Sequence, residues 1–416
     1  MLFAALSCAA VERADPQSED FSPERLARID ARMREAVEEG VMVGGHALIA
    51  RDGKVVYDQL WGMADREREL PLREDALYRI YSMSKPITSV ALLMLYEEGR
   101  FLLGDPVAKY LPELAGLTLL QTGDDGENGS VSPGRQPTVR DLLRHTAGMS
   151  YGVFGDTPVD RLYRETRLFQ ASTLAGFTET LGTLPLLFEP GTRWHYSVSV
   201  DVQGRLIEVL SDMSFGEFLA QRIFEPLGMT DTGFVVAKEK QTRLTQLYSP
   251  VGTVLDWDTP WQFNTETLLE PADPELTQPY LDGSRFESGG AGLVSTMADY
   301  LRFALMLANG GELDGVRLLA PATVEHMRSN HIQDIDSSGL WSMDAFGLGV
   351  GIVTDTARRS GELGADGAYG WGGAAGTNFW IDPEEDIVGI FMVQSVPHQT
   401  PLAKLFRVLT YQALID

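Results

Sequence analysis

The sequence predicts an α+β fold in which both ends of the chain build one antiparallel sheet around a mostly helical insertion. Strand patterns lie at residues 43–60 and 346–395, whereas helical patterns dominate the middle of the chain. A chain of 416 residues is long enough for two domains or for one domain with a large insertion. We expect an α/β domain over 21–80 and 288–416, a mostly helical domain over 81–287 with irregular loops covering the site, and an N-terminal tail or signal-peptide remnant over 1–20.

The first elements have clear local signals. Residues 22–24 combine a Ser cap, a Pro in the first turn and an acid, so they predict the start of a helix over 21–40 that ends at Gly40. The next predicted elements are strands at 43–49 and 54–60, a tight hairpin turn at Asp52-Gly53, and a long apolar helix from near Ser82 to Gly99.

The remaining elements follow from periodicity and turn residues. Residues 121–137 are rich in Gly, Asp and Pro and predict a loop. Residues 249–287 contain many Pro, Asp and Trp with little periodicity, and we expect an irregular segment over the site. The other predicted elements are helices at 138–144 (capped by Thr138), 199–211, 214–225, 297–309 and 400–414, and strands at 346–354, 368–373, 376–382 and 387–395.

The composition restricts the partners and leaves the compartment open. A formal net charge of −25 argues against nucleic acid and anionic membrane surfaces, because both attract basic patches. No run of 18 apolar residues predicts a transmembrane helix. The single cysteine, Cys8, follows a short apolar run that resembles part of a signal peptide. The sequence therefore does not decide whether the protein is cytoplasmic or is periplasmic or secreted. It also does not decide whether the protein is a monomer or a homodimer.

Ser82 and Lys85 are the first candidates for chemistry. They are three residues apart, so a helix places both side chains on one face. A hydroxyl becomes a good nucleophile only when a base removes its proton, and an amine can do this only in its neutral form, which an apolar environment favours. The alternative is an exposed helix start with a solvated lysine, in which Ser84 serves as the helix cap.

Two further segments supply possible partners for Ser82. Tyr196 follows a turn and would complete a proton relay if its hydroxyl lay near the Ser and Lys; its alternative is ordinary packing. The segment 369–376 is rich in glycine and would let a substrate approach the backbone, where an N–H could join that of Ser82 in an oxyanion hole. Its alternative is a plain hairpin turn.

Other motifs are weaker evidence for a catalytic site. Residues 148–152 match the Gly-x-Ser-x-Gly pattern around Ser150, but that nucleophile elbow needs a strand before it and a helix after it, whereas a helix precedes this one and a loop follows. We expect His145 to form a hydrogen bond within a loop turn and His195 to be packed. No metal-ligand spacing or phosphate-binding loop is present, so no metal and no cofactor are predicted.

In order and spacing, several motifs together resemble the serine β-lactamase and penicillin-binding protein superfamily, in its class C branch, and most closely the family VIII carboxylesterases. They are residues 81–86, 138–148, 196–198, 290–296 and 371–373. The resemblance covers about residues 22–414. It implies that Ser82 is the nucleophile, that Lys85 and Tyr196 are the base pair, and that the backbone N–H of Ala374 is the second oxyanion donor beside that of Ser82.

Two departures from the lactamase and peptidase pattern favour neutral esters. Val198 stands where that group usually has an Asn that binds a substrate amide, and Trp371-Gly372-Gly373 stands in place of Lys-Thr-Gly, whose Lys attracts a carboxylate. We expect residues 371–373 and Val198 to shape substrate binding, with Trp371 as an apolar wall. The expected function is a carboxylesterase that hydrolyses neutral short-chain esters through a Ser82 acyl-enzyme, with weak β-lactam hydrolysis as a side activity. The alternatives are a β-lactamase or D-amino-acid peptidase, an acyltransferase, a Gly-x-Ser-x-Gly hydrolase and a non-catalytic binding module.

Overall fold

A large antiparallel sheet organises the molecule. The computed structural model describes residues 11–122, 128–253, 255, 259–261, 267–340, 344–356 and 362–415. The sheet has 8 strands in the order β12-β13-β14-β15-β16-β1-β2-β3. Their bounds are β12 Ala345–Phe346, β13 Gly351–Ile352, β14 Tyr369–Gly372, β15 Asn378–Asp382, β16 Ile387–Val393, β1 Gly44–Arg51, β2 Lys54–Asp65 and β3 Leu70–Pro71.

The central pairing joins the two ends of the chain. β1 pairs with β16 in antiparallel register, with Leu48 opposite Ile390. β1 also forms the predicted hairpin with β2, in which Arg51 pairs with Lys54. Asp52 and Gly53 both have positive φ, 50° and 76°, which is the turn geometry that matches the twist of a two-residue hairpin. The predicted α+β class, with a sheet built from both ends, is confirmed.

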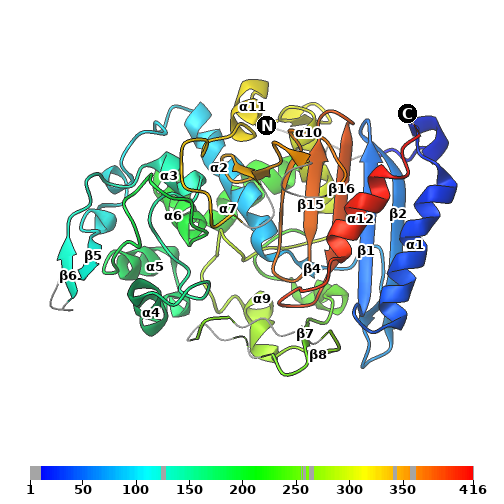
Figure 1. Ribbon diagram of the computed structural model, residues 1–416, viewed down its shortest axis with the longest axis horizontal. Coiled ribbons are helices and arrows are strands. Elements are labelled where there is room, and N and C mark those ends of the chain that lie inside the picture. Colours follow the sequence, from blue (N-terminus) through cyan, green and yellow to red (C-terminus); the bar gives the residue numbers. More distant parts are fainter. Residues whose placement is uncertain are drawn as a thin grey trace.

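Helices cover both faces of this sheet (Figure 1). Alternate residues of β16 point to opposite faces, so Ile390 joins the main core while Phe391 joins a second core. The second core contains side chains of α1 (Pro23–Glu38) and α12 (Leu402–Tyr411), which lie beside each other on one face. The main core contains side chains of α2 (Ser84–Glu97) and α10 (Met297–Ala308) on the other face.

The remaining elements include the helices on the left of Figure 1, beyond α2. The helices are α3 Val139–Leu143, α4 Pro158–Glu165, α5 Leu174–Leu181, α6 Ser199–Ser211, α7 Phe215–Leu219, the π-helical turn η6 Ala220–Phe224, α8 Glu225–Leu227, α9 Pro279–Asp282 and α11 Pro321–Met327. The 3-10 turns are η1 Pro16–Glu19, η2 Tyr81–Met83, η3 Val107–Lys109, η4 Pro112–Leu114, η5 Leu168–Gln170, η7 Lys238–Arg243 and η8 Pro274–Leu276. The small strand pairs are β4 Tyr78–Arg79 with β9 Val294–Ser295, β5 Leu119–Thr122 with β6 Asn128–Val131, β7 Tyr248–Pro250 with β8 Leu269–Pro271, and β10 Glu312–Leu313 with β11 Val316–Arg317.

The predicted helix caps are confirmed at two of three positions. The Ser22 hydroxyl accepts a hydrogen bond from the Arg25 N–H at 3.3 Å at the start of α1. Thr138 begins α3 with a capping box completed by Asp141. Ser84 is not a cap: α2 continues from η2 without a side-chain cap, and the Ser84 hydroxyl instead accepts from the Leu293 N–H at 3.2 Å.

Several predicted boundaries are wrong. The predicted strand 346–354 is divided into β12 and β13, because Gly349 has φ +90° and the Gly347 N–H turns back to the Val350 carbonyl at 2.8 Å. Part of the predicted loop 121–137 forms the arms of the β5–β6 pair, with residues 123–127 outside the described chain. Sequence periodicity also missed α4 and α5.

The division into two domains stays a prediction. The apolar run that contains Cys8 lies outside the described residues. Within the residues described, none of the helices combines the length and the hydropathy needed to cross a bilayer.

Candidate active site

Ser82 lies in η2, the turn that leads directly into α2. Hydrogen bonds hold this turn on both sides: the Ile80 N–H donates to the Leu293 carbonyl at 3.0 Å, and the Tyr300 hydroxyl donates to the Met83 carbonyl at 3.0 Å. Tyr81, just before the serine, has φ +43°, a conformation that costs a non-glycine residue free energy and that is concentrated at functional sites. The fold therefore holds Ser82 in a fixed position at the start of a buried helix.

Lys85 is the second residue of α2, three residues after Ser82, and its side chain is almost fully buried. Its Nζ is 3.1 Å from the Ser82 Oγ and 2.7 Å from the Gly290 carbonyl oxygen, to which it donates a hydrogen bond. The same Nζ lies 4.5 Å from the ring centroid of Tyr196 and 5.3 Å from that of Tyr151. A neutral amine in this position can take the proton of the serine hydroxyl without a further movement.

Tyr196 is buried beside the serine and the lysine, between aromatic neighbours. The Trp371 Nε1 donates to its hydroxyl at 3.4 Å. On another side the ring of His145 lies 5.0 Å away, and its Nδ1 accepts from the Ser197 N–H at 3.3 Å. Burial, with a smaller effect of the Lys85 charge, holds the pKa of His145 well below its ordinary value. A neutral imidazole therefore packs against Tyr196 and adds no positive charge to the site.

The glycine-rich segment forms a turn beside Ser82. The Gly373 carbonyl accepts from the Gly376 N–H at 3.0 Å. Since a trans peptide directs its C=O and N–H to opposite sides, this bond also fixes the direction of the Ala374 N–H. Gly373 itself must be glycine, because a Cβ there would lie 2.4 Å from the Ile80 carbonyl oxygen. The turn is thus packed directly against the segment that carries the serine.

A pocket of about 850 Å³ opens above Ser82. Its walls are mainly apolar and aromatic, and Asp156 is the one charged residue among the described residues that line it. Its lining consists of Ser82, Val153, Phe154, Gly155, Asp156, Tyr196, Pro260, Trp261, Trp371, Gly372, Gly373, Ala374, Gly376, Thr377, Asn378, Pro397, His398 and Ala403.

The structure brings most, but not all, of the sequence candidates together. Ser82, Tyr196 and the segment 371–374 line one pocket, and Lys85 lies beneath them. Val198 does not line it: this residue is fully buried in the main core before α6. Ser150 is also buried, where it donates to the Asp160 carboxylate at 2.5 Å, and α3 rather than a strand precedes its motif.

Three further residues next to Lys85 were not assigned from the sequence. Gly290 offers its carbonyl to Lys85, Tyr151 places its ring over the amine, and the buried Asp201 accepts from the Gly290 N–H at 3.1 Å. Gly290 and Tyr151 lie in the motifs 290–296 and 148–152, so a signal was present for both. Asp201 had no local signal, because an acid in the first turn of a helix is normally a dipole partner.

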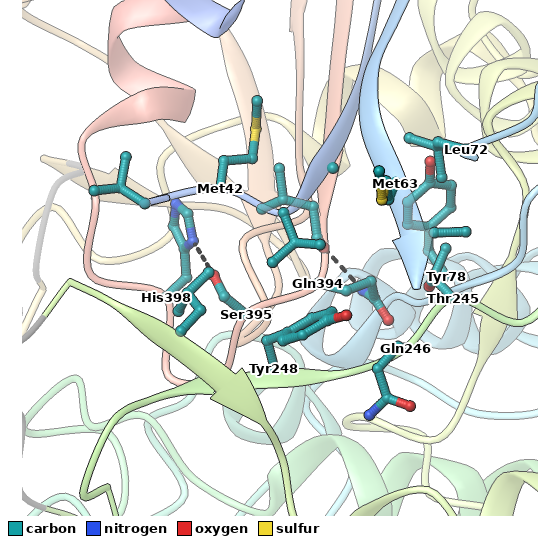
Figure 2. A pocket seen from close by; sticks show the side chains of 16 residues that line it. Met42, Met63, Leu72, Tyr78, Thr245, Gln246, Tyr248, Gln394, Ser395 and His398 are labelled. Carbon is teal, nitrogen blue, oxygen red and sulfur yellow. Dashed lines mark hydrogen bonds between the residues drawn. The ribbon is translucent and has the colours of Figure 1, made fainter. Parts of the chain in front are cut away.

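A second hollow shares His398 with the pocket, and Figure 2 shows the side chains that line it. Its volume of about 10 Å³ is close to the space of a single water molecule. The His398 Nδ1 lies 2.9 Å from the Ser395 hydroxyl, and its backbone N–H donates to the Ala374 carbonyl at 2.9 Å. His398, in the wall of this hollow, therefore supports the glycine-rich turn. Across the described ranges, His, Cys, Asp and Glu form no group of three that could hold a metal ion.

Comparisons with known proteins agree with this geometry. The sequence profile of the Beta-lactamase family matches residues 29–412. Protein Rv1367c of Mycobacterium tuberculosis is 32% identical over 375 residues, which cover 88% of this chain and 89% of that protein. Esterase EstB of Burkholderia gladioli is 28% identical and the match covers 86% of this chain and 87% of the esterase.

A solved structure extends the likeness to the whole fold. EstCE1, described as a hydrolase with promiscuous acyltransferase activity, has a TM-score of 0.77 at 26% identity, over 93% of this chain and 99% of that one. The predicted resemblance is confirmed, and EstB and EstCE1 agree with its family VIII branch. The chain therefore belongs to the Beta-lactamase family of serine hydrolases.

Proposed function

We propose that the protein is a carboxylesterase that hydrolyses neutral esters through a covalent acyl-enzyme on Ser82. The observation that carries this proposal is the 3.1 Å contact between the Ser82 Oγ and the buried Lys85 Nζ at the floor of an apolar pocket. The likeness to EstB and EstCE1 supports the same class of reaction.

In the proposed reaction the Ser82 Oγ attacks the ester carbonyl while Lys85 and Tyr196 accept its proton. The C–O bond to the alcohol then breaks, and the same pair returns the proton to the departing alkoxide. Water attacks the acyl-enzyme in a second cycle, loses its proton to the pair, and releases the carboxylic acid and free Ser82. The N–H groups of Ser82 and Ala374 stabilise the oxyanion in both steps.

The lining of the pocket supports a neutral substrate. Among the described residues that line it there is no Lys or Arg. By the motif resemblance, Trp371 takes the place of the lysine in the Lys-Thr-Gly pattern. A carboxylate substrate would meet Asp156 and an apolar wall, so its desolvation would be uncompensated. A short acyl chain is proposed on one side of the ester. The volume of about 850 Å³ leaves room for a larger apolar group on the other.

The test is a panel of p-nitrophenyl esters of increasing acyl length on the wild type and on Ser82→Ala and Ser150→Ala. We expect Ser82→Ala to be inactive, Ser150→Ala to stay active, and mass spectrometry to find the trapped acyl group on the peptide containing Ser82. Strong turnover of penicillins or D-peptides with negligible ester turnover would contradict the proposal. Failure of a fluorophosphonate to label the wild type would instead favour a binding module.

Acyl transfer is the second candidate, because the pocket has space for an alcohol acceptor that competes with water. EstCE1 is described with such a side activity. The measurement is the ratio of new ester to free acid when a primary alcohol is added to the hydrolysis reaction. A ratio well above that expected from the alcohol concentration would identify a transferase.

A further inference from the structure

Asp201 is a buried acid behind the proposed base. It lies in the first turn of α6 and its side chain is fully buried. One carboxylate oxygen, Oδ1, accepts from the Ser288 hydroxyl at 2.5 Å and from the Gly290 N–H at 3.1 Å. The Ser288 Oγ in turn accepts from the Ala291 N–H at 3.1 Å. Asp201 therefore anchors the loop 288–292 at several points.

The same loop holds Lys85. The N–H of Gly290 is bound by Asp201, while the carbonyl of Gly290 accepts from the Lys85 Nζ at 2.7 Å. A side chain at this position would force its surroundings to shift, because a Cβ would lie 2.8 Å from the Asp201 Oδ2 and 2.9 Å from the Tyr151 hydroxyl. A single residue thus connects the carboxylate to the amine, and a shift of the loop would move the acceptor of Lys85.

Charge links the two groups as well as geometry. Burial raises the pKa of Asp201, and the Ser288 hydroxyl, the Lys85 charge and the Gly290 N–H oppose this rise. Burial and then the Asp201 charge hold the pKa of Tyr151 well above its ordinary value, so that this hydroxyl stays protonated. Burial of an isolated carboxylate costs free energy, so a buried carboxylate near a buried lysine points to a role for the pair.

We propose that Asp201 is a positioning residue of the reaction, which holds the loop 288–292 so that the Gly290 carbonyl fixes the Lys85 amine against Ser82. The proposal rests on the proposed function, in which Lys85 is the base. It adds that the buried charge of Asp201, which interacts with the charge of Lys85, contributes to the pH dependence of the reaction. The titratable groups that act on Asp201 are Lys85 from α2 and Tyr151 from the loop after α3.

The main test is the pH profile of kcat/KM for a short p-nitrophenyl ester with Asp201→Asn. Asn keeps the shape and an acceptor for Ser288 and Gly290 but removes the negative charge. Removal of a buried negative charge disfavours bound protons nearby, so the acid limb of the profile should move to lower pH by about one unit. KM should stay within about threefold, since Asp201 does not line the pocket. An acid limb equal to that of the wild type would overturn the charge effect.

Two more variants test the anchoring. Asp201→Ala removes the charge and the hydrogen bonds, and kcat should fall about tenfold to hundredfold. Ser288→Ala keeps the carboxylate and removes one anchor, so kcat should fall about threefold to tenfold even if Asp201→Ala does not fold. Ser288→Ala with the kcat of the wild type would overturn the anchoring.

Asp299→Asn is the matched control. Asp299 is also a buried acid in the first turn of a helix, α10, with a pKa raised by burial, but its charged neighbours are Asp231 and Lys240. The acid limb of the pH profile of Asp299→Asn should equal that of the wild type.

Lys85→Ala distinguishes failure of the proposed function from failure of the inference about Asp201. Activity in Lys85→Ala would refute the proposed function, whereas an inactive Lys85→Ala beside unaltered Asp201 variants would refute this inference alone.

Discussion

Gly373→Ala should slow the reaction strongly without removing any reacting side chain. The new Cβ would lie 2.4 Å from the Ile80 carbonyl oxygen and 2.3 Å from the Thr377 Oγ1. Ordinary contacts begin about 1 Å further out, so the turn must move away from Ser82 by roughly that distance. A misplacement of about 1 Å can cost about 100-fold in rate, and loss of one oxyanion donor costs about 100- to 1000-fold in kcat. We therefore expect kcat to fall at least about 100-fold.

The assay is steady-state kinetics with a short p-nitrophenyl ester, together with the melting temperature of each variant. Gly372→Ala is the matched control, because its Cβ would lie 3.1 Å from the Asn378 side chain and 3.4 Å from the Thr377 carbonyl oxygen, which demands only a small adjustment. It should keep kcat within about fivefold of the wild type. A folded Gly373→Ala enzyme with the kcat of Gly372→Ala would refute the assignment of the Ala374 N–H to the oxyanion.

Three further outcomes are expected. Tyr196→Phe should lower kcat by about 100- to 10,000-fold with little change in melting temperature, because it removes the proton-transfer hydroxyl together with one long hydrogen bond, from the Trp371 Nε1 at 3.4 Å. Stopped-flow measurement of acylation checks this, and unchanged acylation would contradict it. Trp261→Ala should raise KM about tenfold for esters with a bulky apolar group and much less for a small ester, because one aromatic pocket wall is worth roughly 1–2 kcal/mol. Equal effects on both esters would count against this wall as a contact for the larger group. Burial lowers the pKa of His398 to about 4, so its contribution to stability is present above about pH 6.5 and is lost as the pH falls toward 4. That contribution is about 1–3 kcal/mol. When the pH is lowered from 7 to 5, the free energy of unfolding of His398→Asn should therefore fall less than that of the wild type, as measured by urea unfolding.

Elements with strong local signals could be predicted from the sequence. Ser22 and Thr138 cap their helices as expected, and the Asp52-Gly53 turn joins β1 to β2. Each of these signals acts over a few residues and needs no distant partner. The division of the strand 346–354 escaped prediction, because the turn at its centre is also held by a hydrogen bond from another part of the chain, from the Leu348 N–H to the Met327 carbonyl at 2.9 Å.

In the candidate site, too, local contacts could be predicted from the sequence and contacts between distant segments could not. Ser82 and Lys85 share a helix face, so their contact follows from a spacing of three residues. The motifs around Tyr196 and Trp371 could be recognised, but not the 3.4 Å contact between their side chains, which are 175 positions apart in the sequence. Val198 illustrates the opposite error, because its motif position suggested a place in the pocket and the fold buries it in the core.

Local sequence alone determined the helix starts, the first hairpin and the alignment of the serine with its lysine, because short-range hydrogen bonding and helix periodicity suffice for these. Only the tertiary structure decided that Gly290 receives the lysine and that Asp201 holds Gly290. Those contacts depend on how α2, α6 and the loop 288–292 pack around one core. A buried charge is stable only where tertiary packing supplies its hydrogen-bond and charge partners. Neither the residue type of the charged group nor its neighbours in the sequence specify these partners.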